Sequence, residues 1–171
     1  MSKNLILTGM MGVGKSTVGK NLAKKLSYNF IDIDKTIEFE ENLSINSIFK
    51  NKGEPYFRKI EKIITLRELK NSSSVISLGG GAFLNKAIRK LVKSSAISFW
   101  LDISIEKLVL RLKMSRKRPL LFKKNIGQTI RKIYLERKKT YIEADHRINC
   151  NTLKQNEIVT KIYNLYENAR N

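Results

Sequence analysis

The sequence is short of the residues that mark many secreted and membrane proteins. Cysteine occurs once among 171 residues, at Cys150, so no internal disulfide can form and a reducing cytoplasm is the expected compartment. No apolar run approaches the roughly 20 residues that cross a bilayer. The first apolar strand begins at about residue 4, which leaves no room for a signal or transit peptide. We therefore expect a cytoplasmic protein without a membrane anchor.

Acidic residues are also scarce, since 15 Asp and Glu stand against 34 Lys and Arg and give a formal net charge of +19. Such a charge usually suggests that a protein binds nucleic acid. Here the lysines are scattered along every expected helix, and Lys, Asn and Ile are abundant together, as an AT-rich coding bias also produces. We favour the bias over a nucleic-acid surface, and expect the charge to attract ATP and an anionic substrate.

The most informative stretch is Gly9–Thr17, which has the spacing G-x-x-x-x-G-K-[ST]. It follows an apolar run of strand length at 4–8 and precedes a stretch of helical spacing at 18–26, which is the context that this phosphate-binding motif needs. Glycines let backbone N–H groups converge on phosphate oxygens. Lys15 is expected to reach the outer phosphates, and the Ser16 hydroxyl to ligate Mg²⁺. We predict that the loop binds ATP through Gly12, Val13, Gly14, Lys15, Ser16 and Thr17.

Strand-like and helix-like stretches alternate along the rest of the chain, without repeats or linkers. This alternation predicts an α/β domain spanning 1–171, with a parallel sheet of about five strands and helices on both faces. The expected strands lie at 4–8, 29–34, 75–78, 96–101 and 147–150. The expected helices lie at 18–26, about 35–50, about 53–70, 85–93, 104–112, 126–142 and 157–168.

Ligands of such sheets bind at the carboxyl ends of the strands. Asp32 and Asp34 end the second expected strand. Asp32, expected one strand over from Ser16, would hold the Mg²⁺ shell. Asp34 would point the same way along the strand and accept a proton from an attacking hydroxyl. The alternative is that the two aspartates only cap the next helix.

Gly79, Gly80 and Gly81 end the third expected strand, where they would let a ligand approach bare backbone; a flexible turn is the alternative. Arg58, with Glu61 three residues on, would suit a substrate carboxylate or be a solvated helix charge. Residues 113–125 are dense in cations and predict a mobile lid, in which Arg118 before Pro119 would meet the transferring phosphoryl group or be a surface charge.

Together these residues resemble the shikimate kinases, small P-loop kinases of the nucleoside-monophosphate-kinase type. The resemblance runs in order over about residues 4–145. It rests on the motifs at 9–17, 30–34, 53–61, 77–82 and 118–121, on Arg137 with Tyr141, and on Ala144-Asp145.

The resemblance implies ATP-dependent phosphorylation of the 3-hydroxyl of shikimate on the route to chorismate and the aromatic amino acids. It implies a substrate-binding helical segment at about 33–61 and a lid at about 113–125. We expect the protein to be a monomer. The resemblance implies that shikimate is bound by Asp34, Arg58, Gly79, Gly80, Gly81 and Arg137. It also implies that Arg118 contacts ATP from the lid and that Arg111 lies against the adenine.

Two other classes of function remain open from the sequence. Gluconate and nucleoside-monophosphate kinases share the loop and the fold, but they would not need Arg58 with Glu61, the triple glycine and Arg137 together. A basic P-loop domain that binds nucleotide or nucleic acid without transferring phosphate would explain the charge, but not the intact set of transfer residues.

Overall fold

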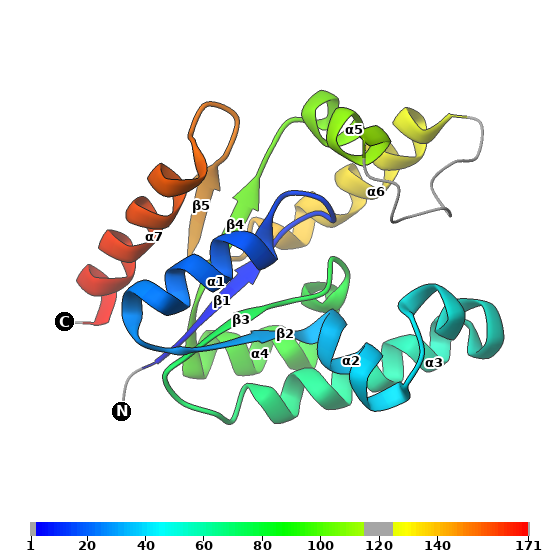
Figure 1. Ribbon diagram of the computed structural model, residues 1–171, viewed down its shortest axis with the longest axis horizontal. Coiled ribbons are helices and arrows are strands. Elements are labelled where there is room, and N and C mark those ends of the chain that lie inside the picture. The colour runs from blue at the N-terminus through cyan, green and yellow to red at the C-terminus, as the bar shows by residue number, and fades with distance from the viewer. Residues whose placement is uncertain (1–2, 115–124, 171) are drawn as a thin grey trace.

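The computed structural model describes residues 3–114 and 125–170. Its centre is a single sheet of five strands in the order β2-β3-β1-β4-β5, with every neighbouring pair parallel (Figure 1). The strands are β1 (Asn4–Thr8), β2 (Asn29–Asp32), β3 (Ser74–Ser77), β4 (Ala96–Asp102) and β5 (His146–Asn149). The predicted five-stranded parallel sheet is confirmed.

The central strands β1, β3 and β4 are buried along their whole length, as strands covered on both faces must be. On one face α1 (Lys15–Leu26) packs against α7 (Gln155–Arg170), and on the other α4 (Lys86–Ser95) contacts β4 (Figure 1). The remaining helices are α2 (Ile33–Glu41), α3 (Ile45–Glu68), the short η1 (Ala82–Leu84), α5 (Ile105–Met114) and α6 (Ile126–Tyr141).

The helix expected at about 35–50 is divided, which corrects the prediction. Asn42 adopts a left-handed φ of 49° and ends α2, and the Ser44 hydroxyl then accepts a hydrogen bond from the N–H of Ser47 at 3.1 Å and starts α3. The break expected near 51–53 is a kink inside α3, where Gly53 has φ of 80°. The lid expected at 113–125 overlaps the end of α5, and its residues 115–124 lie outside the described part of the chain.

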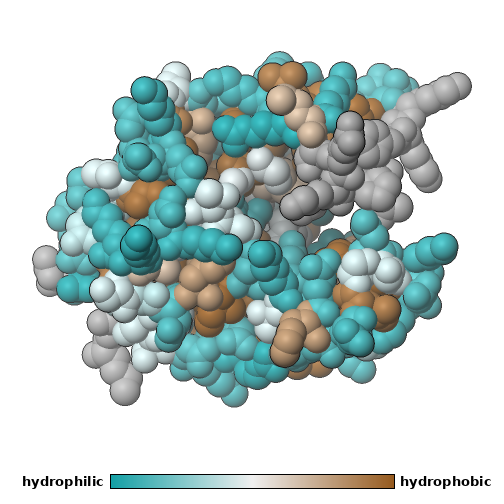
Figure 2. Space-filling model, viewed as in Figure 1, coloured by the Kyte–Doolittle hydropathy of each residue, from teal (hydrophilic) through white to brown (hydrophobic). Residues whose placement is uncertain are grey.

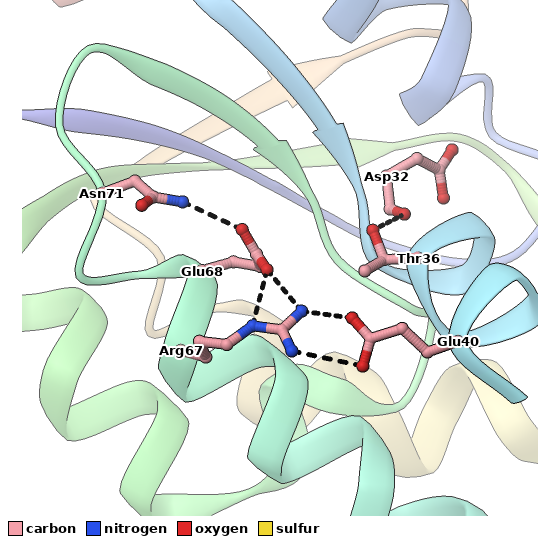
Figure 3. A network of polar contacts seen from close by, with 6 residues as sticks. All are labelled: Asp32, Thr36, Glu40, Arg67, Glu68 and Asn71. Carbon is pink, nitrogen blue, oxygen red and sulfur yellow. Dashed lines mark hydrogen bonds and ion pairs between the residues drawn. The ribbon is translucent and has the colours of Figure 1, made fainter.

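An ionic network fixes α2 against the second half of α3 (Figure 3). Arg67 of α3 donates to both carboxylate oxygens of Glu40 on α2, at 2.5 and 3.2 Å, and also to Glu68. Glu68 in turn accepts from the Asn71 side chain at 2.9 Å. Because these charges are exposed, the network contributes more to the orientation of α2 than to stability.

The surface seen in Figure 2 is mainly hydrophilic. Among the described residues, no helix combines the length and the apolar character needed to cross a membrane.

A reciprocal hydrogen-bond pair fixes the chain where it enters β5. The Asp145 carboxylate accepts from the N–H of Ser98 at 2.8 Å and from its hydroxyl at 2.6 Å, while that hydroxyl accepts from the N–H of Asp145 at 3.0 Å. Ser98 is only 1% exposed, so water cannot replace the carboxylate easily.

Asp145→Ala is expected to lower the free energy of unfolding by about 1–3 kcal/mol, because it leaves two buried donors of Ser98 without an acceptor. Urea unfolding followed by circular dichroism measures the change.

Glu143→Ala is the matched control, since Glu143 precedes the same strand but forms exposed ion pairs with Arg89 and Lys93. That variant should lose less than about 1 kcal/mol. Equal losses in the two variants would show that burial of Ser98 does not decide the effect.

Candidate active site

The loop predicted to bind phosphate joins the end of β1 to the start of α1, so its strand–loop–helix context is confirmed. Gly9 has φ of 135°, and a Cβ there would lie 2.5 Å from the carbonyl oxygen of Leu101. Only glycine therefore fits at the first position of the loop. Because α1 begins at Lys15, its first N–H groups and the positive end of its dipole face the loop.

The Lys15 side chain lies across the loop that precedes it and is 9% exposed. Its Nζ donates to the carbonyl oxygens of Gly9 at 2.8 Å and Met10 at 3.0 Å. These contacts keep the ammonium group at the mouth of the loop, where it can meet phosphate oxygens.

Ser16 and Asp32 lie together, with the Ser16 hydroxyl donating to Oδ2 of Asp32 at 2.5 Å. The expectation that Asp32 is one strand over is wrong, because β3 lies between β2 and β1. Asp32 also caps α2 by accepting from the N–H of Lys35 at 3.4 Å, so capping and the Ser16 contact coexist. A hydroxyl and a carboxylate fit Mg²⁺, which takes few protein ligands and completes its shell with water and phosphate oxygens.

Asp34 does not continue the strand, which corrects the expectation that it points the same way as Asp32. It lies in the first turn of α2, because β2 ends at Asp32. Its Oδ1 lies 2.7 Å from the position that a Cβ on Gly79 would take, and Oε1 of Glu61 lies 2.5 Å from the same position. Two carboxylates thus converge on the first glycine of the triple-glycine loop.

Arg58 on α3 is held by two carboxylates. Its NH1 donates to Oε2 of Glu61 at 2.7 Å, as the spacing predicted, and its Nε and NH2 donate to Oε1 of Glu54 at 3.1 Å. A Cβ on Gly81 would lie 2.5 Å from NH1 of Arg58. The guanidinium therefore packs directly on the glycine loop, and the alternative of a solvated helix charge does not describe it.

Glu61 is a buried carboxylate, 3% exposed, and its Oε1 has no hydrogen-bond partner among the described residues. Burial raises the pKa of Glu61 above its ordinary value, although the positive charge of Arg58 opposes this shift. The negative charge of Asp34 adds to the increase.

The middle of the glycine loop lies between α6 and the phosphate loop. A Cβ on Gly80 would lie 3.0 Å from NH1 of Arg137 and 3.5 Å from the backbone nitrogen of Met11. The carbonyl oxygen of Gly80 accepts a hydrogen bond from the hydroxyl of Tyr141 on α6. The structure thus brings Arg137 to the loop, whereas the role of Tyr141 was not foreseen, although its i+4 spacing from Arg137 places both on one face of a helix.

Two arginines were expected on the nucleotide side. Arg111 on α5 donates from NH1 to the carbonyl oxygen of Val13 at 3.0 Å, so it lies against the phosphate loop. Arg118 lies outside the described residues.

The fold and this arrangement define the class of protein. A phosphate-binding loop lies beside a glycine loop flanked by two guanidinium groups and two carboxylates, which is the site of a small P-loop kinase.

The chain belongs to the shikimate kinase family, because the sequence profile of that family matches residues 11–167. The chain is similar to the shikimate kinase of Persephonella marina, with 42% identity over 94% of this chain and 96% of the relative. It is also similar to that of Bartonella henselae, with 38% identity over 92% of this chain and 77% of the relative.

Solved structures agree. The shikimate kinase of Acinetobacter baumannii, in complex with shikimate, superimposes with a TM-score of 0.93 at 31% identity, covering 99% of this chain and 96% of that one. The shikimate kinase of Aquifex aeolicus gives 0.85 at 36% identity, covering 97% and 98%. A gluconokinase of Sinorhizobium meliloti gives 0.63 at 17% identity and shares only the fold.

The raised pKa of Glu61 predicts a pH-dependent stability. As pH rises above about 4.5, the ordinary pKa of a glutamate carboxyl, the unfolded chain releases this proton before the folded chain does, so the wild type loses stability. Glu61→Gln cannot titrate, and its free energy of unfolding should rise relative to wild type across that window. Denaturant unfolding at several pH values from 4.5 to 8 measures the difference.

Glu54→Gln is the control, because it removes the other partner of the same guanidinium from a side chain that is 61% exposed. A pH-independent difference between Glu61→Gln and wild type would mean that burial of Glu61 does not govern its ionisation.

Proposed function

We propose that this chain transfers the γ-phosphoryl group of ATP to the 3-hydroxyl of shikimate, through the residues grouped around the glycine loop. The observation that carries the proposal is the position of Gly80, between NH1 of Arg137 and the backbone nitrogen of Met11 in the phosphate loop. An acceptor bound on the glycine loop would lie next to the outer phosphate of a nucleotide bound on the other loop.

The acceptor side suits a small hydroxylated carboxylate. Arg58 and Arg137 offer forked donors for a planar carboxylate, and both pack on the glycine loop. No backbone carbonyl among the described residues accepts a hydrogen bond from the N–H of Gly80 or Gly81, so these donors could serve a ligand. Gluconate is also a hydroxylated carboxylate, and a nucleotide offers a phosphate that arginine binds equally well, so the choice of shikimate rests on the family to which the chain belongs.

Asp34 is proposed as the group that receives the proton of the attacking hydroxyl. The hydroxyl oxygen forms a bond to the γ-phosphorus, the bond from that phosphorus to the bridging oxygen breaks, and ADP carries away the electron pair. Lys15, the N–H groups of the phosphate loop and Arg118 would stabilise the charge on the phosphates. Ser16 and Asp32 would hold Mg²⁺, which neutralises phosphate charge when bound.

Residues 1–171 would form one monomeric kinase unit in the cytoplasm, with a substrate segment at about 33–61 and a lid at about 113–125. Arg111 would lie beside the adenine. The high net charge serves capture of anions, with no nucleic acid partner.

The direct test is a coupled assay of ADP release with purified protein and Mg²⁺. Shikimate should support turnover, whereas gluconate and nucleoside monophosphates should not. ATP binding without turnover on any of these acceptors would favour the non-catalytic P-loop domain and overturn the proposal.

Asp34→Asn and Asp32→Asn should both slow turnover, for different reasons. Asp34→Asn removes the proton acceptor, so we expect a fall of roughly 10²–10⁴-fold in kcat. Asp32→Asn weakens the Mg²⁺ site, so raising Mg²⁺ should restore part of its rate. Steady-state rates over a range of Mg²⁺ concentrations separate the two.

Equal rescue of both variants by Mg²⁺ would show that these roles are divided wrongly. Circular dichroism of both proteins checks that α2, which Asp32 caps, is still formed.

Arg58→Lys should raise the KM for shikimate about tenfold or more, because lysine cannot present two parallel donors to a carboxylate. The KM for ATP should change by less than about twofold, since Arg58 contacts α3 residues and the glycine loop and not the phosphate loop. An unchanged KM for shikimate would remove Arg58 from substrate binding.

A further inference from the structure

Tyr141 ends α6 inside the core, and it is the side chain on which the glycine loop rests. Its ring is fully buried and lies 5.9 Å from that of Trp100, centroid to centroid. Its hydroxyl donates to the carbonyl oxygen of Gly80 across 61 residues of sequence. Neither the sequence motifs nor the proposed chemistry gives this hydroxyl a role.

The hydrogen bond fixes more than one atom, because a peptide unit is planar and trans. With the Gly80 carbonyl oxygen directed at Tyr141, the N–H of Gly81 must point to the opposite side. Gly81 is also the residue on which Arg58 packs, at 2.5 Å from the Cβ position. The orientation of one peptide therefore decides where a backbone donor points, and it sets the surface against which the first guanidinium packs.

The second guanidinium depends on the same hydroxyl. Arg137 lies one helical turn before Tyr141 on α6, and its NH1 is 3.0 Å from the Cβ position of Gly80. Burial raises the pKa of Tyr141, with the nearby charge of Arg137 opposing the shift, so the phenol stays protonated as a donor at neutral pH. Glycines without such a contact would sample many conformations.

We propose that Tyr141 is a positioning residue for the acceptor: its hydroxyl holds the Gly80–Gly81 peptide and the adjoining guanidinium groups in the geometry that grips the shikimate carboxylate. This inference rests on the proposed role of the glycine loop and Arg137. Tyr141 acts through these groups and does not itself touch the reacting atoms.

The competing explanation is that Tyr141 only fills the core. Its ring alone would then matter, and the hydroxyl would affect stability without affecting substrate. The two explanations differ in what the loss of a single oxygen atom does to shikimate binding.

The test is Tyr141→Phe, measured by steady-state kinetics with each substrate and by calorimetric titration with shikimate. The KM and Kd for shikimate should rise roughly five- to tenfold, the size expected for one buried hydrogen bond. The KM for ATP should stay within about twofold, since the hydrogen bonds of Lys15 and Arg111 to the phosphate loop do not involve Tyr141.

Tyr134→Phe is the matched control. Tyr134 lies on the same helix, is 9% exposed and donates from its hydroxyl to Oδ1 of Asp102 at 2.9 Å. It also loses one buried hydroxyl, and its melting temperature should fall at least as much because its acceptor is an Asp side chain that also pairs with Arg147. Its KM for shikimate should stay within about twofold of wild type.

Three outcomes would overturn the inference: an unchanged shikimate KM in Tyr141→Phe, an equal rise in Tyr134→Phe, or an equal rise in the KM for ATP. Arg137→Lys is the arm that separates this inference from the proposed function. If Arg137→Lys weakens shikimate binding and Tyr141→Phe does not, only the inference fails. If neither does, the proposed acceptor site fails.

A measurement on the unaltered chain covers the case in which Tyr141→Phe does not fold. With the hydrogen bond in place before substrate arrives, Gly80 and Gly81 should show backbone order parameters of about 0.85 by nitrogen relaxation, as rigid backbone does. Values below about 0.6 in the ligand-free protein would overturn the inference.

Discussion

The ion pair between Arg58 and the buried Glu61 is the contact on which the proposed acceptor site depends. A carboxyl group that is 3% exposed is costly to ionise unless a cation and hydrogen bonds compensate the charge, and Arg58 supplies both at 2.7 Å while burial still raises the pKa of Glu61. The pair fills the space under the glycine loop, where side chains on Gly79 or Gly81 would collide with Glu61 and Arg58. None of these glycines has a positive φ, so their identity follows from the charges packed against them and not from a turn.

The second organising feature is the platform made by β1 and β4. The phosphate loop leaves β1 at Gly9, which packs against the Leu101 carbonyl oxygen of β4 with no room for a side chain. The next residue of β4, Asp102, accepts from Tyr134 of α6 at 2.9 Å and from Arg147 of β5 at 2.6 and 2.9 Å. The same central strand thus contacts the phosphate loop and, through Asp102, also α6 and β5.

Sequence patterns predicted what depends on local spacing. The glycine loop before Lys15, the alternation of apolar strands with helices and the pairing of Arg58 with Glu61 are all short-range signals, and the structure confirms each. The errors arose where distant parts of the chain decide the outcome. Asp34 lies on a helix because Asp32, held by Ser16, ends the strand and caps α2. The insertion of β3 between β2 and β1 is likewise a long-range pairing that no local period reveals.

The same distinction explains why Tyr141 could be singled out in a motif without being given a function. Its spacing from Arg137 indicates a shared helix face, but its hydrogen-bond partner Gly80 lies 61 residues earlier in the chain, in the glycine loop. A glycine loop is useful to a ligand because it exposes backbone donors, and it is costly because glycine has many conformations to lose. The Tyr141 hydroxyl offsets this entropy cost, because its hydrogen bond holds the loop in one conformation without occupying space that a ligand needs. Tyr141 is itself held in place by α6, which Tyr134 joins to β4.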